Sequence, residues 1–362
     1  MIKVGRLDRE FCKYQNEYEE KALSVLRSGQ YILGNEVRAF EEEFADYVGT
    51  QYCAGVACGL DALQIAIKAL GIGKGDEVIV QGNAYIASVM GITLNGGTPI
   101  FTEPDAYYQI DTSKIEEKIT SKTKAVLAVH LYGQTAKMDD LVQICRKYNL
   151  KLVEDCAQAH GAAFQGKMAG TFGDVGCFSF YPSKNLGAFG DAGAIVTDDA
   201  GIAEFVKIYR NYGSEKRYHN KMVGVNSRLD ELQAGLLRVK LKHMQEIIDE
   251  RIELSERYSI GIQKNEIIKP LTRTETINVW HQYVIRIKER EKFIRYMDEK
   301  GIGWLVHYPI PPHLSEAYRY LNLSRGSLPI TEGYADTVLS IPIYNGMTNE
   351  EQRKVIDVIN AY

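Results

Sequence analysis

Residues 151–197 read KLVEDCAQAHGAAFQGKMAGTFGDVGCFSFYPSKNLGAFGDAGAIVT. The segment opens with apolar residues typical of a β-strand, and the carboxylate pair Glu154 and Asp155 follows them directly. A second β-rich run, 175–181, leads to Lys184 and then to glycine-rich sequence. Pyridoxal phosphate needs a lysine for its Schiff base and an acid for its pyridinium nitrogen. Asp155 and Lys184 lie 29 residues apart, so the fold must bring them together.

Strand-like and helix-like segments alternate around this stretch. Strands are expected at 52–57, 77–80, 98–102, 124–133, 151–154 and 175–181, and helices at 36–48, from 61, from about 87, and at 112–119 and 138–150. Such alternation predicts an α/β fold with a mostly parallel sheet flanked by helices. Right-handed crossovers then place the functional loops at the carboxyl ends of the strands.

The C-terminal third has a different pattern. Residues 227–258 have the pattern of one long helix, which is typical of a connection between two domains. Strand-like 281–287, helical 291–300 and the segment 302–308 follow it. We therefore expect a large domain at 1–245, whose first 35 residues form an arm, and a small α+β domain at 246–362.

Composition excludes several function classes. The length of 362 residues predicts two domains, and a formal charge of −4 argues against a nucleic-acid partner. The N-terminus lacks the apolar core of a signal peptide, and no run of about 18 apolar residues occurs, so we expect no membrane span. The six cysteines form no CxxC pair, as in reduced proteins. We expect a soluble, cytoplasmic protein.

Three other sequence features could indicate ligand sites. Gly161 to Lys167 spells GxxxxGK, but Met168 follows where a P-loop has a hydroxyl residue, and QGKMAG is more typical of a hairpin turn. The seven histidines show no compact metal-ligand spacing, so no metal site is expected. The turn Cys58-Gly59-Leu60-Asp61, between a predicted strand and a predicted helix, can present free N–H groups to a phosphate. An ordinary loop is the alternative interpretation of that turn.

The chain resembles the DegT/DnrJ/EryC1/StrS sugar aminotransferases, a branch of the fold type I pyridoxal phosphate enzymes. The resemblance runs from GQYILG at 29–34 to IPIYNGMT at 341–348 and is most specific around Lys184. Those enzymes have Ser-Gly-Thr-Asp-Ala-Leu where this chain has Cys-Gly-Leu-Asp-Ala-Leu. Two hydroxyl groups are therefore missing, and the resemblance leaves the N–H groups of Gly59 and Leu60, with the Ser179 hydroxyl, to hold the phosphate.

The resemblance also assigns the other cofactor contacts. Tyr85 covers the ring, Asp155 pairs with the ring nitrogen, and Gln158 touches the phenolic oxygen. Lys184 forms the Schiff base and then moves a proton as general base and acid. Asn226, in GVNSRLDELQAG at 224–235, reaches the phosphate of the other subunit's cofactor, which implies a homodimer with shared active sites.

The substrate residues implied by the resemblance form a separate group. They are Tyr31, Lys216, Tyr218, His307 and Tyr308. Cationic and phenolic side chains suit an anionic diphosphate. Ordinary structural roles, a charged loop around 214–221 and a proline-rich loop after 307, remain alternatives.

The function that the resemblance implies is transfer of an amino group from L-glutamate to a nucleotide-linked keto-deoxysugar. The chain is most like enzymes that aminate C-3 of a dTDP-3-keto-6-deoxyhexose. Alternatives are amination at C-4, or an aminotransferase of the same fold acting on a non-nucleotide ketone such as a cyclitol. A non-catalytic regulator is a further alternative, against which the intact Asp155 and Lys184 argue.

Overall fold

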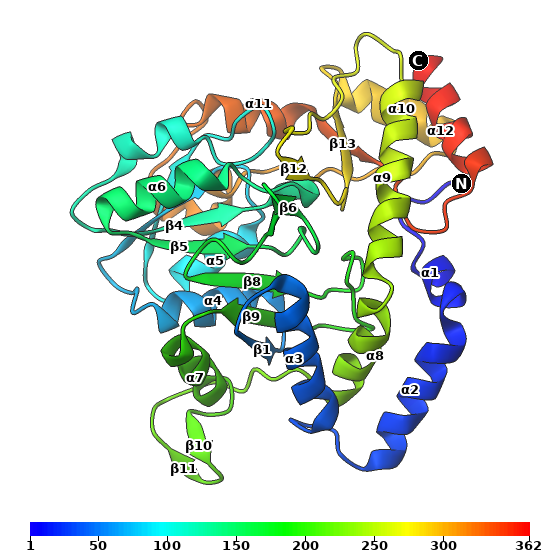
Figure 1. Ribbon diagram of the computed structural model, residues 1–362. Coiled ribbons are helices and arrows are strands. Elements are labelled where there is room, and N and C mark those ends of the chain that lie inside the picture. Colours follow the sequence, from blue (N-terminus) through cyan, green and yellow to red (C-terminus); the bar gives the residue numbers. More distant parts are fainter.

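The computed structural model describes residues 1–362 and is built around one seven-stranded sheet (Figure 1). The sheet order is β1-β9-β8-β5-β4-β2-β3. All neighbouring strands from β8 to β3 are parallel, and only β9 runs against the others. The bounds are β1 Tyr52–Val56, β2 Glu77–Gln81, β3 Thr98–Thr102, β4 Thr123–Val129, β5 Lys151–Asp155, β8 Val175–Ser179 and β9 Gly193–Thr197. The predicted, mostly parallel α/β fold is confirmed.

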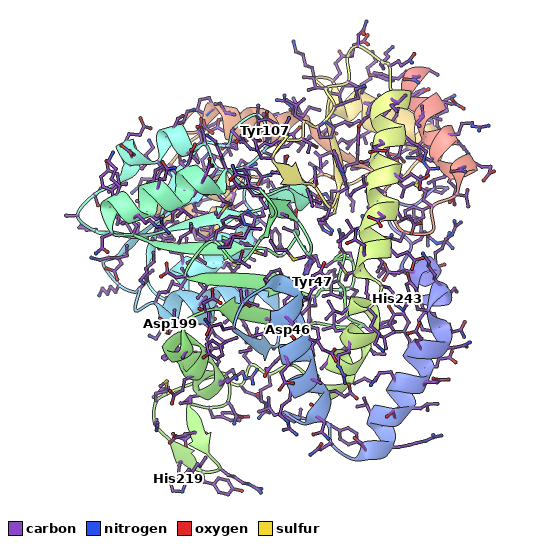
Figure 2. The ribbon with its side chains drawn as sticks, viewed as in Figure 1. Asp46, Tyr47, Tyr107, Asp199, His219 and His243 are labelled. Atoms are coloured by element: carbon purple, nitrogen blue, oxygen red, sulfur yellow. The ribbon has the colours of Figure 1, made fainter.

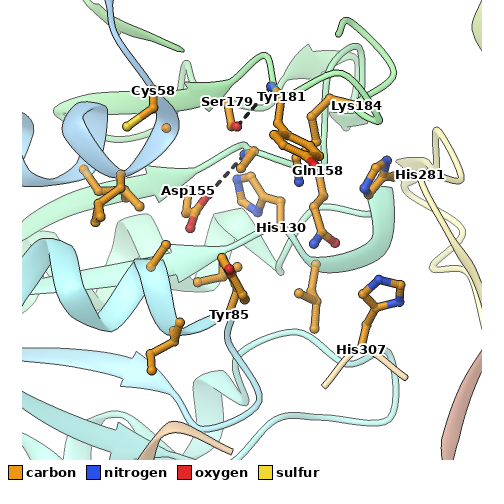
Figure 3. Close-up of a pocket in the computed structure, with 18 of the residues that line it drawn as sticks. Cys58, Tyr85, His130, Asp155, Gln158, Ser179, Tyr181, Lys184, His281 and His307 are labelled. Atoms are coloured by element: carbon orange, nitrogen blue, oxygen red, sulfur yellow. Dashed lines mark hydrogen bonds between the residues drawn. The ribbon is translucent and has the colours of Figure 1, made fainter. Parts of the chain in front are cut away.

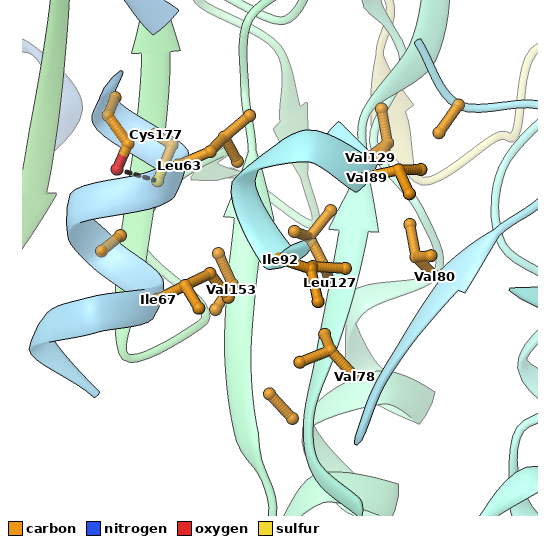
Figure 4. Packing of buried hydrophobic residues seen from close by; sticks show 14 of the residues in the cluster. Leu63, Ile67, Val78, Val80, Val89, Ile92, Leu127, Val129, Val153 and Cys177 are labelled. Carbon is orange, nitrogen blue, oxygen red and sulfur yellow. Dashed lines mark hydrogen bonds between the residues drawn. The ribbon is translucent and has the colours of Figure 1, made fainter. Parts of the chain in front are cut away.

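Helices cover both faces of this sheet because its central strands are apolar on both sides. Val78 and Val80 of β2 belong to the apolar cluster under α4 (Gly59–Ala69) and α5 (Ile86–Thr93), which Figure 4 shows. Ile79, between them in sequence, belongs to the cluster under α6 (Met138–Tyr148) on the other face. This alternation is the two-residue period of a strand. It explains why the strands read as continuous apolar runs.

The remaining helices of the large unit pack beside the sheet. α3 (Asn35–Val48) confirms the helix predicted at 36–48 and buries Val37, Phe40, Phe44 and Val48, which lie three and four residues apart. α2 (Gln15–Ser28) and α3 both pack on α8 (Glu231–Leu241), and α7 (Ala200–Tyr209) follows β9. The helix predicted at 112–119 is instead two short 3₁₀ turns, Thr112–Lys114 and Glu116–Lys118. The side-chain oxygen of Asp111 accepts from Ser113 N and caps the first of them.

A second cluster of apolar residues forms the C-terminal unit. Its two-stranded antiparallel sheet pairs β13 (Tyr283–Arg286) with β14 (Val338–Ile341). The helices around it are α9 (Met244–Gly261), α10 (Arg290–Glu299) and α12 (Asn349–Asn360). α11 (Pro329–Thr337) and the 3₁₀ turn at Glu316–Leu321 instead pack on the large unit, where Tyr334 and Tyr318 join the cluster under α4 and α5, and a further 3₁₀ turn lies at Pro312–Leu314. Ile2 from the N-terminus is buried in the same cluster and bridges to Ile302. The domain boundary near 245 falls at the start of α9 and remains a prediction.

The long helix predicted at 227–258 is two helices. α8 ends at Leu241 and α9 begins at Met244, with a break at Lys242 and His243. The His243 ring stacks on Tyr14, with ring centres 3.9 Å apart, and its Nε2 lies 2.9 Å from Glu17 Oε1. Contacts with the N-terminal arm, α1 (Leu7–Lys13) and α2, therefore accompany the break, and periodicity alone does not reveal them. Figure 2 shows His243 facing that arm.

Short two-stranded and three-stranded sheets lie outside the central sheet. β6 (Ala163–Phe164) and β7 (Lys167–Met168) pair through a turn in which Gln165 and Gly166 have positive φ, so the hairpin predicted for QGKMAG is confirmed. β12 (Thr276–Ile277) pairs with β6. β10 (Ser214–Lys216) and β11 (His219–Asn220) form a tongue that projects from the body, with His219 at its end (Figure 2). None of the helices combines the length and apolar character needed to cross a bilayer.

Candidate active site

A pocket of 550 Å³ opens at the carboxyl ends of β4, β5 and β8 (Figure 3). The starts of α4 and α5 and the loop after β8 form most of its wall, and residues of the C-terminal unit close it. Of the residues proposed from the sequence, it gathers Gly59, Leu60, Tyr85, Asp155, Gln158, Ser179, Lys184, His307 and Tyr308. The site therefore lies where a mostly parallel sheet is expected to bind ligands.

Asp155 is the last residue of β5 and its side chain lines the pocket while being 5% exposed. Its Oδ2 accepts a 2.7 Å hydrogen bond from the Ser88 hydroxyl, and its Oδ1 accepts from Ala157 N at 3.1 Å. Neither partner is a cation, and the carboxylate makes no ion pair. A cationic group entering the pocket would therefore meet a carboxylate that has no direct ion-pair partner, although its charge also attracts Lys184 in the same pocket.

Lys184 follows β8 in a loop closed by a 2.8 Å hydrogen bond from its own N–H to Tyr181 O. Its side chain lines the pocket, and its amine makes no hydrogen bond or ion pair within the protein. Burial lowers the pKa of Lys184 to about 8, against the opposing attraction of Asp155. About a tenth of such amines are neutral at pH 7. A neutral amine is what nucleophilic attack on a carbonyl group requires.

The start of α4 meets the end of β8 at the pocket wall. Cys58 caps the helix, with its Sγ accepting from Asp61 N at 3.4 Å. The N–H groups of Gly59 and Leu60 are in the first turn, where a helix offers them no partner of its own. A Cβ at Gly59 would lie 2.5 Å from Ser179 Cβ, so only glycine permits this approach. Two N–H groups and a hydroxyl thus converge at the positive end of a helix, as anion binding requires.

Aromatic rings and an amide line the mouth of the pocket. The rings of Tyr85, at the start of α5, and Tyr308 lie 4.8 Å apart and tilted by 33°. Gln158 donates from Nε2 to the Tyr308 hydroxyl at 3.1 Å, and its Oε1 accepts from Tyr132 N at 2.7 Å. Burial raises the pKa of Tyr308, so this phenol stays protonated. Tyr85 is about half exposed, which leaves a ring face for a planar ligand.

The C-terminal unit adds two histidines and a glutamine. Gln282 donates to His307 Nε2 at 3.0 Å, so the ring proton sits on Nδ1, which donates to Ser340 Oγ at 2.8 Å. Burial and the nearby Lys184 lower the pKa of His307 to about 4. The pKa of His281 is lowered for the same reasons, and its Nδ1 lies 3.3 Å from Asn185 Oδ1. Both histidines are therefore neutral near pH 7.

Sequence reasoning did not find Ser88, His281 or Gln282. Ser88 lies in the first turn of α5, and its bond to Asp155 joins residues 67 positions apart, so no local pattern reveals it. His281 and Gln282 precede β13, more than 90 residues after Lys184, and no local pattern connects them to the site. His160 is buried between the rings of Phe178 and Phe180, and neither of its ring nitrogens has a hydrogen-bond partner.

Four residues proposed from the sequence lie outside this pocket. Tyr218 is 82% exposed in the β10–β11 tongue, next to the exposed Lys216. Tyr31 is exposed and donates from its hydroxyl to Leu26 O at 3.0 Å. Asn226 is exposed and bridges to Asn211 through the backbone. A single chain does not bring these four side chains to Lys184.

One buried cluster has the composition of a metal site. Ligand atoms of His130, Glu154 and Cys156 lie within 4.8 Å of one another. Glu154 already accepts from His130 Nε2 at 2.9 Å and from three backbone N–H groups at 170–173. His130 N also donates to Asp155 O at 3.0 Å. The cluster is a hydrogen-bond network that anchors the end of β5 beside Asp155.

The chemical groups that line the pocket match those that pyridoxal phosphate needs. The unpartnered amine of Lys184, the carboxylate of Asp155 and the free N–H groups at α4 face one cavity. The half-exposed ring of Tyr85 lines the same pocket as the carboxylate of Asp155 (Figure 3). An amine-reactive aldehyde, a protonated ring nitrogen and a phosphate would each meet a suitable group.

Comparison with known proteins agrees with this fit. The model of the DegT/DnrJ/EryC1/StrS aminotransferase family matches residues 13–360. The chain is 51% identical to the dTDP-3-amino-3,6-dideoxy-alpha-D-galactopyranose transaminase of Aneurinibacillus thermoaerophilus, over 97% of this chain and 96% of that one. It is 44% identical to the dTDP-3-amino-3,4,6-trideoxy-alpha-D-glucose transaminase of Streptomyces venezuelae, with 93% and 90% covered.

The fold comparison is equally close. The structure of S. venezuelae DesV in complex with a ketimine intermediate superposes with a TM-score of 0.97 at 42% identity, covering 99% of this chain and 98% of that one. Fold and site define a fold type I pyridoxal phosphate enzyme. The chain belongs to the DegT/DnrJ/EryC1/StrS aminotransferase family, so it is a pyridoxal phosphate-dependent aminotransferase.

Proposed function

We propose that this aminotransferase moves an amino group from L-glutamate to C-3 of a dTDP-linked 3-keto-6-deoxyhexose. The observation that carries the proposal is the pocket that joins the neutralisable amine of Lys184 to the carboxylate of Asp155. The substrate class is supported by the 51% identical relative, whose name specifies a dTDP-3-amino-dideoxyhexose transaminase.

Within this proposal, Lys184 and Asp155 carry the chemistry. When bound, pyridoxal phosphate supplies the aldehyde that accepts the amino group and a protonated ring that withdraws electrons from the reacting carbon. Asp155 holds the ring nitrogen in its protonated state by a charge-assisted hydrogen bond. The neutral amine of Lys184 would bond to the cofactor's aldehyde carbon with loss of water, and after displacement by the amino donor it would carry a proton from the donor's amino-bearing carbon to the cofactor carbon. Its lowered pKa suits both roles.

The other cofactor contacts are assigned by position. Gly59, Leu60 and Ser179 hold the phosphate, because their N–H groups and hydroxyl converge at the start of α4. Tyr85 packs on the ring, and Gln158 faces the phenolic oxygen from beside Tyr308. The positions of these residues in the pocket wall support these assignments.

We further propose a homodimer with shared active sites. Asn226 is exposed and away from its own chain's pocket, so it is available to the phosphate in a partner's pocket. The tongue with Lys216 and Tyr218 projects from the body and leaves both side chains free for the nucleotide part of the substrate. The exposed ring of Tyr31 is free for it as well. His307 and Tyr308 contact the sugar from the chain's own C-terminal unit.

All six cysteines are unpaired, which supports a reducing compartment such as the cytoplasm.

The test is a two-step reaction followed by absorbance. Purified protein loaded with pyridoxal phosphate is first mixed with L-glutamate, which should convert the cofactor to its amine form and change its visible absorbance. After removal of glutamate, dTDP-3-keto-6-deoxyglucose and its galacto isomer are added separately. One of them should restore the original spectrum, and NMR of the product should place the new amino group at C-3.

Each other result identifies an alternative. An amino group at C-4 of a dTDP-4-keto sugar, with no reaction of the 3-keto sugars, would replace the proposed ring position. If only a cyclitol ketone restores the original spectrum of the cofactor, the substrate carries no nucleotide. No spectral response to glutamate in cofactor-loaded protein would contradict transamination and favour a regulator. Sedimentation of the protein as a monomer would contradict the shared sites.

A further inference from the structure

The carboxylate of Asp155 is held from two sides by very different groups. Its Oδ1 accepts from Ala157 N, a donor two residues along its own loop. Its Oδ2 accepts from the hydroxyl of Ser88, which lies 67 residues away on α5. Ionised carboxylates only accept hydrogen bonds, so the Ser88 hydroxyl is the donor. At 2.7 Å this bond has the length typical of a hydroxyl donor.

Ser88 is fully buried and Asp155 is 5% exposed. Water therefore has little access to the Ser88 side of the carboxylate, and loss of the hydroxyl would leave Oδ2 without this donor. Without the hydroxyl, the carboxylate would keep one contact from its own loop and would be free to rotate about its terminal torsion. Burial thus makes the orientation of Asp155 depend on a residue from another element.

The same helix turn also presents Tyr85. Tyr85 is the residue before α5, Ser88 lies three positions on, and Ser88 N donates to Tyr85 O at 3.0 Å. Tyr85 has an extended conformation just outside the helix, so this backbone hydrogen bond, and not a shared helix face, links the two residues. The first turn of α5 therefore fixes the position of the aromatic ring relative to that of the acid, the two groups that would contact the plane and the nitrogen of the cofactor ring (Figure 3).

We propose that Ser88 is a positioning residue that orients Asp155 toward the cofactor's ring nitrogen and couples it to the Tyr85 ring. The proposal rests on the proposed function only in requiring that Asp155 faces the cofactor. It requires nothing of the sugar substrate. Ser88 itself touches no reacting atom and acts through Asp155.

The experiment measures cofactor binding to cofactor-free protein, with activity as a second readout. Ser88→Ala should raise the Kd for pyridoxal phosphate by about tenfold, the effect of a hydrogen bond to a charged group. It should slow the reaction with saturating L-glutamate by a similar factor. Ser88→Thr keeps the hydroxyl and should restore both values to within about threefold, after allowance for one added methyl group. Ser255→Ala is the matched control, because Ser255 is buried on α9 and its hydroxyl bonds to Ile252 O, far from Asp155 in the fold.

A double-mutant cycle separates positioning from a general structural role. In an Asp155→Ala background, the further change Ser88→Ala should alter the Kd by less than about twofold, because the hydroxyl acts only through the carboxylate. A tenfold loss in both backgrounds would overturn the proposal, as would a Ser88→Ala protein that binds and reacts like the wild type. If the wild type binds cofactor and responds to glutamate but aminates no sugar, the substrate assignment alone falls. If the wild type binds no cofactor, both proposals fall.

Discussion

The approach of α4 to β8 gives a sharp prediction for Gly59→Ala. The added Cβ would lie 2.5 Å from Ser179 Cβ, 3.0 Å from its Oγ and 3.1 Å from its Cα. Ordinary contacts between carbon atoms are about 3.5–4.0 Å, so the helix start and the strand end must separate by about 1 Å. The backbone of Ser179 cannot swing aside as a flexible side chain would, because it pairs with Gly193 of β9.

The expected magnitude follows from overpacking. Inserting one methyl group into a well-packed site costs typically about 1–3 kcal/mol. The separation also moves the N–H groups of Gly59 and Leu60 away from the Ser179 hydroxyl, so a phosphate can no longer meet all three. We expect a loss of phosphate-group affinity of about tenfold or more, since each charge-assisted hydrogen bond contributes about 1.5–3 kcal/mol.

Two measurements check this prediction. Titration of cofactor-free protein gives the Kd for pyridoxal phosphate, and pyridoxal without its phosphate serves as the comparison ligand. Gly59→Ala should weaken the first and leave the second nearly unchanged. Gly333→Ala is the control, because that glycine lies in α11 with no atom near the added Cβ and should gain about 0.5–1 kcal/mol of stability. Wild-type affinity for pyridoxal phosphate in Gly59→Ala would refute the phosphate cradle.

Three further predictions concern buried charge and capping. The pKa of Lys184 is about 8 in the folded protein instead of 10.5, so the charged amine destabilises the cofactor-free protein below pH 8. In thermal unfolding, Lys184→Met should therefore stabilise the cofactor-free protein by about 3 kcal/mol at pH 7. This gain should disappear as the pH rises from 8 to 10.5. A constant gain at all pH values would contradict the buried ammonium. Cys58→Ser replaces a thiol cap by a better acceptor for Asp61 N and should add about 0.5–1 kcal/mol in denaturant unfolding; a loss of stability would show that the thiol packs instead of capping. Glu41→Ala leaves the buried guanidinium of Arg210 without its carboxylate and should cost about 3–5 kcal/mol in the same assay, whereas an unchanged midpoint would mean that the pair contributes nothing.

The parallel part of the sheet follows from local sequence. β3 spans the predicted 98–102, and β2 and β5 each extend one residue beyond the predicted strand, because a strand buried on both faces has a continuous apolar run. The sequence does not indicate that β9 runs antiparallel, because a buried antiparallel strand has the same apolar composition as a buried parallel one. The break at His243 was also missed, because stacking on Tyr14 is a contact between residues more than 200 positions apart.

The same distinction holds for the site. Asp155 and Lys184 could be proposed because one segment carries both and the chemistry demands both. Gly59 was proposed as a backbone donor, but its close approach to Ser179 needed the structure. His281 and Gln282 reach the pocket through the packing of the C-terminal unit on the sheet, which no local pattern encodes. Long-range packing therefore sets the part of the pocket that sequence reasoning could not provide.

Chemical trapping of the cofactor tests the central claim most directly. Protein loaded with pyridoxal phosphate is reduced with borohydride, digested and analysed by peptide mass spectrometry. The account predicts one labelled peptide, with the phosphopyridoxyl group on Lys184, and no label when L-glutamate is added before reduction. A label on any other lysine, or none in a protein that has bound the cofactor, would contradict the role given to Lys184.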